Sequence, residues 1–296
     1  MAFRTVVVSS RSKLDFSMNY VVIRGEKELK IHLSEISVLI LESTAISITN
    51  ALMVELIKGK VKVICCDEKH LPCFQLVGLY DNYHSAKQIQ MQAEWKESTK
   101  KAVWTSIIEN KIKNQSILLK KSGKKEYLML ENYVGELELG DKTNREGHAA
   151  KVYFNELFGE GRRTPTYYNS ALNYGYAILL SAFCREITAS GCITQLGIWH
   201  NNEFNPYNLA SDLMEPYRVI VDDLALSLDE GDEDFKYKMA NLLNGKVKIR
   251  GKVTYLDTAI EVYVKSVISA LNSDDVTLIK HFSEYELPVY ENNCNV

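Results

Sequence analysis

The chain has 296 residues, of which 46% are hydrophobic and 25% are charged, so it is long enough to bury one or two sizeable cores. Its formal net charge of -3 excludes a uniformly basic nucleic-acid-binding domain, and any contact with DNA must come from local patches. Residues 1–10 lack the pattern of a secretion signal, no apolar run approaches the ~18 residues of a membrane span, and the six cysteines show no metal-ligand spacing, so we expect a protein of the reducing cytoplasm without membrane contact.

The first eighty residues are dense in β-branched side chains separated by short turns. Gly25, which three charged residues follow, predicts a hairpin turn. Thr49 or Asn50 can cap a short amphipathic helix that ends at Gly59. We therefore expect a β domain with one helix at residues 1–80, with strands at 5–8, 14–24, 29–33, 38–41, 61–64 and from Pro72 to about residue 79.

A polar stretch at residues 80–84 changes the character of the chain, and we assign residues 81–88 to a linker. Beyond it, apolar residues recur every three or four positions, as in amphipathic helices. The exception is an alternation of lysine and arginine with apolar residues around Gly251, which predicts a small hairpin with one cationic face. The sequence thus predicts an α+β protein with a mostly helical domain at 89–296, whose helices fall near 95–107 and at 145–157, 169–187, 209–228 and 255–271.

Charge is segregated along the second half of the chain. Lysines crowd residues 96–125, where only Glu97 and Glu109 oppose them, whereas residues 222–234 contain acids and no base. This pattern indicates either a positive face for a polyanion or ordinary solvated helix faces beside an acidic loop, and charge alone favours neither. If DNA binds, our candidates for phosphate contacts are Lys96, Lys100, Lys101, Lys111, Lys248 and Arg250.

Two segments place metal-capable side chains at the ends of predicted elements. Glu146 stands in the first turn of the helix that opens after Asn144, where the helix dipole alone would also favour a carboxylate. His200 follows an apolar run and Gly197, and is either a hydrogen-bonded structural residue or a ligand.

The densest group of such side chains surrounds Pro216. On a regular helix Asp212, Glu215 and Asp222 would share one face, with Arg218 between the last two. Pro216 has no N–H to donate to the carbonyl of Asp212, so the helix should kink or begin there. Carboxylates bordering apolar surface repel each other unless a cation lies between them, and we therefore favour a functional site over a solvated face.

A polar face also runs along the predicted helix at 169–187. Asn169, Asn173 and Tyr176 follow helical spacing, with Tyr174 nearby. These side chains can line a site or tie helices together, and for each one taken singly the structural role is favoured.

In their order along the chain, these motifs resemble the CRISPR-associated spacer-acquisition integrase, the metal-dependent subunit that inserts new spacers into a CRISPR array, and they look closest to its type II-A branch. The resemblance implies a catalytic Glu, His and acidic trio that binds the metal, here Glu146, His200 and Glu215. Many family members carry Asp at the last position, so Asp212 remains the alternative ligand. The matching segments are residues 4–8, 31–36, 144–150, 173–176 and 210–218.

Two carboxylates and one imidazole suit Mn²⁺ or Mg²⁺ with positions left for water and a phosphate oxygen. Such an ion supports in-line attack by the 3′-hydroxyl of a DNA fragment on a phosphodiester, and with water as the nucleophile the same site is an endonuclease. Side chains that could support this trio from nearby are Asp212, Asn173, Tyr174 and Arg218.

The resemblance also implies partners. These are double-stranded DNA (the spacer precursor and the CRISPR repeat), a second copy of the chain bound through the β domain, a small ferredoxin-like adaptation subunit, and contact with the effector nuclease and a further adaptation subunit. Two rival interpretations stay open: a stand-alone metal-dependent nuclease or branched-DNA resolvase, and a non-catalytic DNA-binding scaffold whose carboxylates only brace helices.

Overall fold

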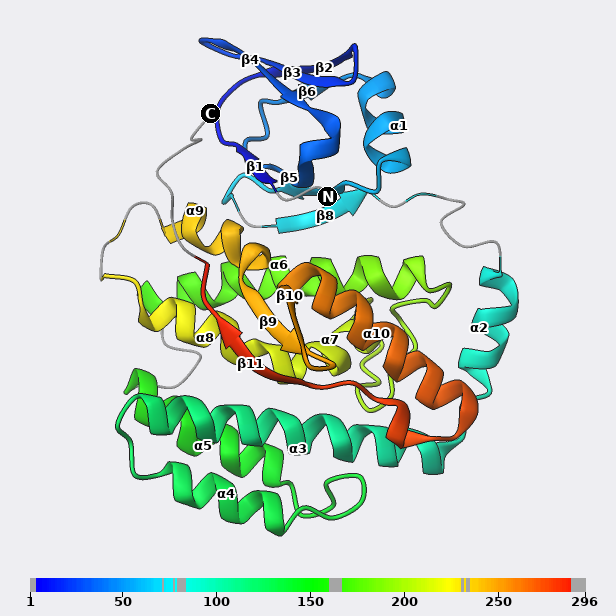
Figure 1. Cartoon of the computed structure of the whole chain (residues 1–296), viewed down its shortest axis with the longest axis vertical. Coiled ribbons are helices and arrows are strands. Elements are labelled where there is room, and N and C mark those ends of the chain that lie inside the picture. Colours follow the sequence, from blue (N-terminus) through cyan, green and yellow to red (C-terminus); the bar gives the residue numbers. More distant parts are fainter. Residues whose placement is uncertain are drawn as a thin grey trace.

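A computed structural model of the chain has strands gathered at its N-terminal end and helices below them (Figure 1). The predicted α+β class, with an N-terminal β region followed by a mostly helical region, is confirmed. Within the described ranges no helix is both long and apolar enough to cross a membrane. The structure describes residues 4–70, 72–76, 78, 84–159, 167–229, 232 and 235–288.

The N-terminal region contains two four-stranded sheets within residues 4–76. Their strands are β1 (Arg4–Val8), β2 (Lys13–Ser17), β3 (Tyr20–Arg24), β4 (Glu28–His32), β5 (Ile36–Leu41), β6 (Ser47–Ile48), β7 (Lys62–Cys66) and β8 (Pro72–Leu76). The inner sheet has the order β1-β5-β7-β8, with β8 antiparallel at its edge, and the outer sheet has the order β4-β3-β2-β6.

The local signals in this region are confirmed, with one correction. The Thr49 hydroxyl accepts a hydrogen bond from the N–H of Leu52 at 3.4 Å and caps α1 (Asn50–Lys58), which Gly59 ends. The segment expected as one strand at 14–24 is two, because Met18 and Asn19 have φ of 48° and 66° and turn the chain in a tight hairpin.

The inner sheet is buried on both faces. Leu39 and Val63 pack with the outer sheet and α1, whereas Ile40 and Ile64, the next residues along their strands, pack with the helical region. Strands covered on both sides are apolar at every position and do not alternate with polar residues, which explains the continuous apolar runs of β1, β5 and β7. Figure 1 shows β8 and α6 (Tyr167–Ala189) lying side by side at this junction.

A buried ion pair crosses the same junction. Lys62 on β7 is 4% exposed, and its ammonium pairs with Asp257 and lies 3.8 Å from the Glu186 carboxylate of α6. Burial, which disfavours the charged form, lowers the pKa of Lys62 to about 7. The two regions are therefore joined by charge as well as by apolar packing.

The helical region is built around α6. Its other helices are α2 (Ser85–Ala93), α3 (Glu97–Lys121), α4 (Tyr127–Gly135), α5 (Arg145–Phe158), α7 (Asn208–Met214), α8 (Arg218–Leu226), α9 (Phe235–Ala240) and α10 (Leu256–Ser273). Of the linker expected at 81–88, residues 81–83 lie outside the described residues, and α2 begins at Ser85. Helix α4 has no counterpart among the elements that the sequence predicts.

A small sheet of order β10-β9-β11 crosses this region, made of β9 (Lys246–Ile249), β10 (Lys252–Tyr255) and β11 (Phe282–Glu286). The predicted hairpin around Gly251 is confirmed, and its turn uses positive φ at Arg250 and Gly251. Val247 and Ile249 are buried, while Lys246 is exposed on the opposite face. Strand β11, which pairs with β9, is not predicted from the sequence.

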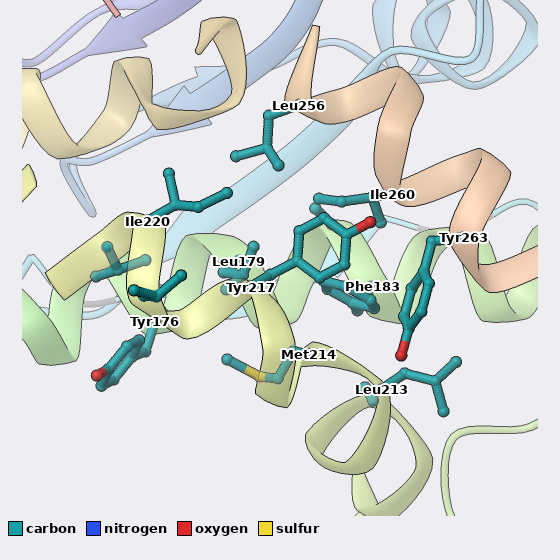
Figure 2. Packing of buried hydrophobic residues seen from close by; sticks show 14 of the residues in the cluster. Tyr176, Leu179, Phe183, Leu213, Met214, Tyr217, Ile220, Leu256, Ile260 and Tyr263 are labelled. Carbon is teal, nitrogen blue, oxygen red and sulfur yellow. The ribbon is translucent and has the colours of Figure 1, made fainter. Parts of the chain in front are cut away.

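Side chains from α6, α7, α8 and α10 converge around Tyr217 (Figure 2). Its ring centroid lies 5.3 Å from that of Phe183 and 5.1 Å from that of Tyr263, and all three rings are buried. Edge-to-face and tilted aromatic pairs at these distances add to the free energy gained by burial. This cluster fixes the short segment that follows Glu215.

Leu39→Ala and Ile40→Ala are each expected to lower the free energy of unfolding by about 2 to 5 kcal/mol, because each leaves a cavity in a different core. Urea unfolding measures both. Leu29→Ala in β4, where the side chain is 37% exposed, is the matched control and should cost far less. A small loss at either residue 39 or residue 40 would contradict burial of the inner sheet on both faces.

Candidate metal centre

One face of α3 is the base of the site. Trp104, Lys111 and Asn114 are seven and three residues apart and project from the same side of this helix, because an α-helix turns once every ~3.6 residues. All three are buried. The elements that carry the predicted site residues pack against α3, namely α5, α7, α8 and the turn between the last two.

The segment around Pro216 is broken as predicted. Helix α7 ends at Met214, residues 215–217 form a 3₁₀ turn, and α8 begins at Arg218. The Asn114 amide donates a hydrogen bond to the carbonyl of Pro216 at 3.0 Å, which ties the turn to α3. The Glu215 side chain, at the start of the turn, is thereby held buried beside α3.

Glu146 is positioned by the N-terminus of α5. The Asp141 carboxylate accepts hydrogen bonds from the N–H groups of Arg145 at 2.7 Å and Glu146 at 3.0 Å, and so caps this helix. Gly147 allows the tight entry, since a Cβ there would lie 2.8 Å from the side-chain oxygen of Asn144. Asp141 was missed from the sequence, because it stands three residues before the N-cap Asn144, outside the position at which a capping residue is recognised.

His200 lies on an irregular loop that the Asp212 carboxylate organises. Asp212 is fully buried and accepts hydrogen bonds from the N–H groups of Ile198, Trp199 and His200 at 2.6, 3.0 and 3.1 Å. The same carboxylate lies 2.5 Å from Nδ1 of His200. A Cβ at Gly197 would lie 2.3 Å from the carbonyl oxygen of His200, so this loop requires glycine there.

The aromatic residues of α3 and this loop fix the imidazole further. The indole of Trp199 stacks on that of Trp104, with centroids 5.5 Å apart and planes 5° apart. The His200 ring meets Trp104 edge-on at 5.7 Å. The position of His200 therefore depends on both α3 and α7.

Lys111 lies at the centre of the site. Its Nζ is 2.6 Å from Oε1 of Glu146 and 2.7 Å from Oε2 of Glu215. The other Glu215 oxygen, Oε1, is 3.0 Å from the guanidinium of Arg218. Lys111 was expected as a surface contact for phosphate, and the structure corrects this: the residue is 8% exposed and its charge faces carboxylates.

The charges of this cluster stabilise one another. Burial disfavours the charged form of Lys111, but Glu215 and Glu146 outweigh it and raise the pKa of Lys111 above its ordinary value. Burial likewise opposes ionisation of Glu215, but Arg218 and Lys111 outweigh it and lower the pKa of that carboxyl. Both shifts favour the charged forms of Lys111 and Glu215.

The donor set has the chemistry of a site for a hard divalent cation, which prefers carboxylate oxygen and tolerates imidazole. Oε2 of Glu215 is buried and faces the ammonium of Lys111 at 2.7 Å, so a cation already lies where this oxygen can bind one. Within the described residues, no three His, Cys, Asp or Glu side chains are arranged to hold an ion as they stand. The ammonium of Lys111 lies between the two carboxylates that such an ion would join.

The other predicted neighbours of the trio diverge. Asp222 accepts hydrogen bonds from the hydroxyls of Tyr153 on α5 and Tyr176 on α6. Tyr174 packs against Phe235, and burial together with Cys66 and Glu42 raises its pKa, so it faces the inner sheet. Asn173 is exposed on α6. Of the side chains predicted to support the trio, Arg218 contacts Glu215 and Asp212 contacts His200.

The remaining predicted phosphate contacts lie at the surface, and their role stays a prediction. Lys101 and Arg250 are exposed. The others have acidic neighbours: Lys96 pairs with Asp274, Lys100 with Glu97 at 2.7 Å, and Lys248 with Glu284 at 2.8 Å.

Comparisons with known proteins agree with this architecture. Residues 5–246 match the family model described as CRISPR associated protein Cas1. A CRISPR-associated endonuclease Cas1 from Neisseria meningitidis serogroup C (strain 8013) is 33% identical over 234 residues, which cover 78% of this chain and 77% of that protein.

Two solved structures share the fold. A casposase bound to an integration product matches with a TM-score of 0.75 and 19% identity over 94% of this chain and 93% of that chain. A chain of a Cas6-RT-Cas1–Cas2 complex matches with a TM-score of 0.70 and 18% identity over 93% of this chain, which spans 36% of the length of that chain. At these identities the likeness concerns the fold.

Asp212→Asn is expected to lower the pKa of His200. The hydrogen bond to Asp212 is the largest cause of the raised pKa of this imidazole, ahead of burial, which opposes it. NMR titration of the His200 ring protons measures the change, with Asp274→Asn at the surface as the matched control. An unchanged His200 pKa in Asp212→Asn would refute the pairing.

The raised pKa of His200 also fixes a pH dependence of stability. The folded protein holds this proton more tightly than the unfolded chain, so the stabilisation is fully present below the ordinary value of 6.5 and is lost as pH rises through the folded pKa. In Asp212→Asn the folded pKa of His200 is lower, so the stabilisation that its proton provides should be lost at a lower pH than in wild type.

Proposed function

This chain belongs to the CRISPR-associated Cas1 family, and on that premise we propose that it is a divalent-metal-dependent DNA integrase and endonuclease. It inserts short double-stranded DNA fragments into a CRISPR array by attack of a 3′-hydroxyl on a phosphodiester. The observation that carries the proposal is the convergence of Glu146 and Glu215 on one cation, within electrostatic range of His200. Assignment to the type II-A branch is part of this proposal and rests on the ordered sequence motifs.

Glu146, His200 and Glu215 would hold the Mn²⁺ or Mg²⁺. When bound, such an ion neutralises charge on phosphoryl oxygens and lowers the pKa of an attacking hydroxyl. With Nδ1 committed to Asp212, the His200 ring can offer only Nε2 to a ligand. Asp212 already accepts its hydrogen bonds from the loop, which supports Glu215 over Asp212 as the third ligand.

The partners of the chain are also part of the proposal. We assign it double-stranded DNA, a second copy bound through the N-terminal sheets, and a small ferredoxin-like adaptation subunit. The likeness of the fold to a chain of a complex that contains Cas1 and Cas2 supports an assembly of this kind. Contact with the effector nuclease and a further adaptation subunit rests on the sequence resemblance, and the free cysteines among the described residues support a reducing compartment.

A non-catalytic scaffold is the second candidate, and one observation favours it. Lys111 neutralises the two carboxylates without any bound ion, as a purely structural brace would. The scaffold and the integrase therefore differ in whether the trio acts on DNA.

His200→Ala is expected to abolish strand transfer while DNA binding persists, because the substitution removes a ligand and no surface cation. The measurement is integration of a duplex with free 3′-hydroxyl ends into supercoiled plasmid, with the small adaptation subunit present and Mn²⁺ or Mg²⁺ titrated against EDTA. Glu203→Gln, on the same loop, is the control. Unchanged product would favour the scaffold, and hydrolysis without strand transfer would favour a stand-alone nuclease or resolvase.

Lys101→Ala and Arg250→Ala are each expected to weaken DNA binding and to reduce the slope of log K against log salt by about 0.9 for each lost phosphate contact. Fluorescence anisotropy over a salt series measures the slope. Lys58→Ala on α1, an exposed lysine paired with Glu55, should leave it unchanged. If all three variants had the same slope as wild type, the DNA would bind to another face of the protein.

A further inference from the structure

The cation between Glu146 and Glu215 is part of the chain itself. We propose that Lys111 is the resident counter-cation of the metal centre: its ammonium holds the two carboxylates together in the metal-free protein, and a divalent ion binds only by displacing it. Lys111 is then a positioning residue that sets the metal affinity of the site. The inference rests on the proposed function, because it assumes that the same carboxylates take the ion.

The first support is electrostatic. Glu215 is buried, and two carboxylates brought close together in a poorly solvated place repel each other unless a cation lies between them. Lys111 supplies that cation at 2.6 and 2.7 Å. A divalent ion in the same place would be repelled by the ammonium, because both are positively charged. The ion and the ammonium therefore cannot stay in close contact with the two carboxylates at the same time.

The second support is the contrast between the two cations of the cluster. Arg218 is anchored twice, by its guanidinium 3.0 Å from Oε1 of Glu215 and by its position 4.9 Å above the ring of Tyr176. Lys111 donates a hydrogen bond to Oε1 of Glu146 at 2.6 Å and lies 2.7 Å from Oε2 of Glu215, so its ammonium is held by the two carboxylates and, unlike Arg218, stacks on no described ring. A lysine ammonium on its flexible four-carbon stem is a point charge that can withdraw, whereas the stacked guanidinium is fixed.

The third support is access. The Glu146 side chain is 24% exposed, whereas those of Lys111 and Glu215 are 9% and 6% exposed. The cluster therefore meets solvent on the Glu146 side, from which an ion can approach and toward which the ammonium can move. An entering ion must carry more charge than the ammonium it replaces, so the arrangement favours divalent over monovalent cations.

Mn²⁺ binding to the full-length chain tests the proposal, measured by calorimetry and by the loss of the free-ion signal in electron paramagnetic resonance. Lys111→Met keeps the length of the side chain and removes its charge, and should bind Mn²⁺ about tenfold tighter or more. Lys111→Arg keeps the charge and should stay close to the wild-type affinity. Lys113→Met, two residues along α3 and paired with Glu109 at the surface, is the matched control and should not change it.

Thermal unfolding gives a readout independent of binding. In EDTA Lys111→Met should melt below wild type, because its carboxylates are left without their cation, and saturating Mn²⁺ should raise its Tm more than that of wild type. If Lys111→Met does not fold without metal, Lys111→Gln carries the same expectations. An Mn²⁺ affinity equal to or weaker than that of wild type, in whichever neutral variant folds, overturns the proposal.

Glu215→Gln separates this outcome from failure of the proposed function. If wild type binds Mn²⁺ and Glu215→Gln does not, the metal centre stands, and the Lys111 variants alone decide the role of the lysine. If wild type and Glu215→Gln bind Mn²⁺ equally, or neither binds it, the metal centre itself is refuted and the role of Lys111 falls with it.

Discussion

The ammonium of Lys111, shared by Glu146 and Glu215, is the contact on which the arrangement of the site depends. It joins three elements distant in sequence: α3, the first turn of α5 and the 3₁₀ turn after α7. Without a cation at this point the two carboxylates would repel each other. That repulsion would disfavour the close approach of the N-terminus of α5 to the buried turn after α7. The packing of α3 against both elements positions the two carboxylates, and the positive charge of Lys111 offsets the repulsion between them.

Each carboxylate near Pro216 has a separate task, although the sequence places them on one helical face. Asp212 binds three backbone N–H groups and the imidazole of His200, Glu215 faces cations, and Asp222 accepts hydrogen bonds from two tyrosines. The elements packed around them cause this division, because Asp212 faces the loop that carries His200, Glu215 faces Lys111 on α3, and Asp222 faces tyrosines of α5 and α6. Environment, more than spacing, decides which of the three is free to meet a metal ion.

The features that could be predicted from the sequence depend on near neighbours: the Thr49 cap, the hairpin at Gly251, the break at Pro216 and the α+β order of elements. The family could be identified because its motifs occur in a fixed order between residues 4 and 218, and the family model matches residues 5–246. Burial of Lys111 could not be predicted, since the acidic partners that the described residues supply are 35 and 104 positions away in the sequence and its neighbours look like a solvated lysine-rich helix. Strand β11 and helix α4 were missed for a related reason, because β11 is defined by pairing with β9 and α4 by packing on α3.

The inner sheet has a mechanical consequence. The inner sheet packs against the outer sheet on one face and against the helices on the other. Lys62 of this sheet also pairs with carboxylates of α6 and α10. Moving the inner sheet against either the outer sheet or the helices beneath it would therefore expose apolar side chains that are now buried. A partner that binds the outer sheet thus acts on the helical region through apolar contacts that continue across the inner sheet, among the residues that the structure describes.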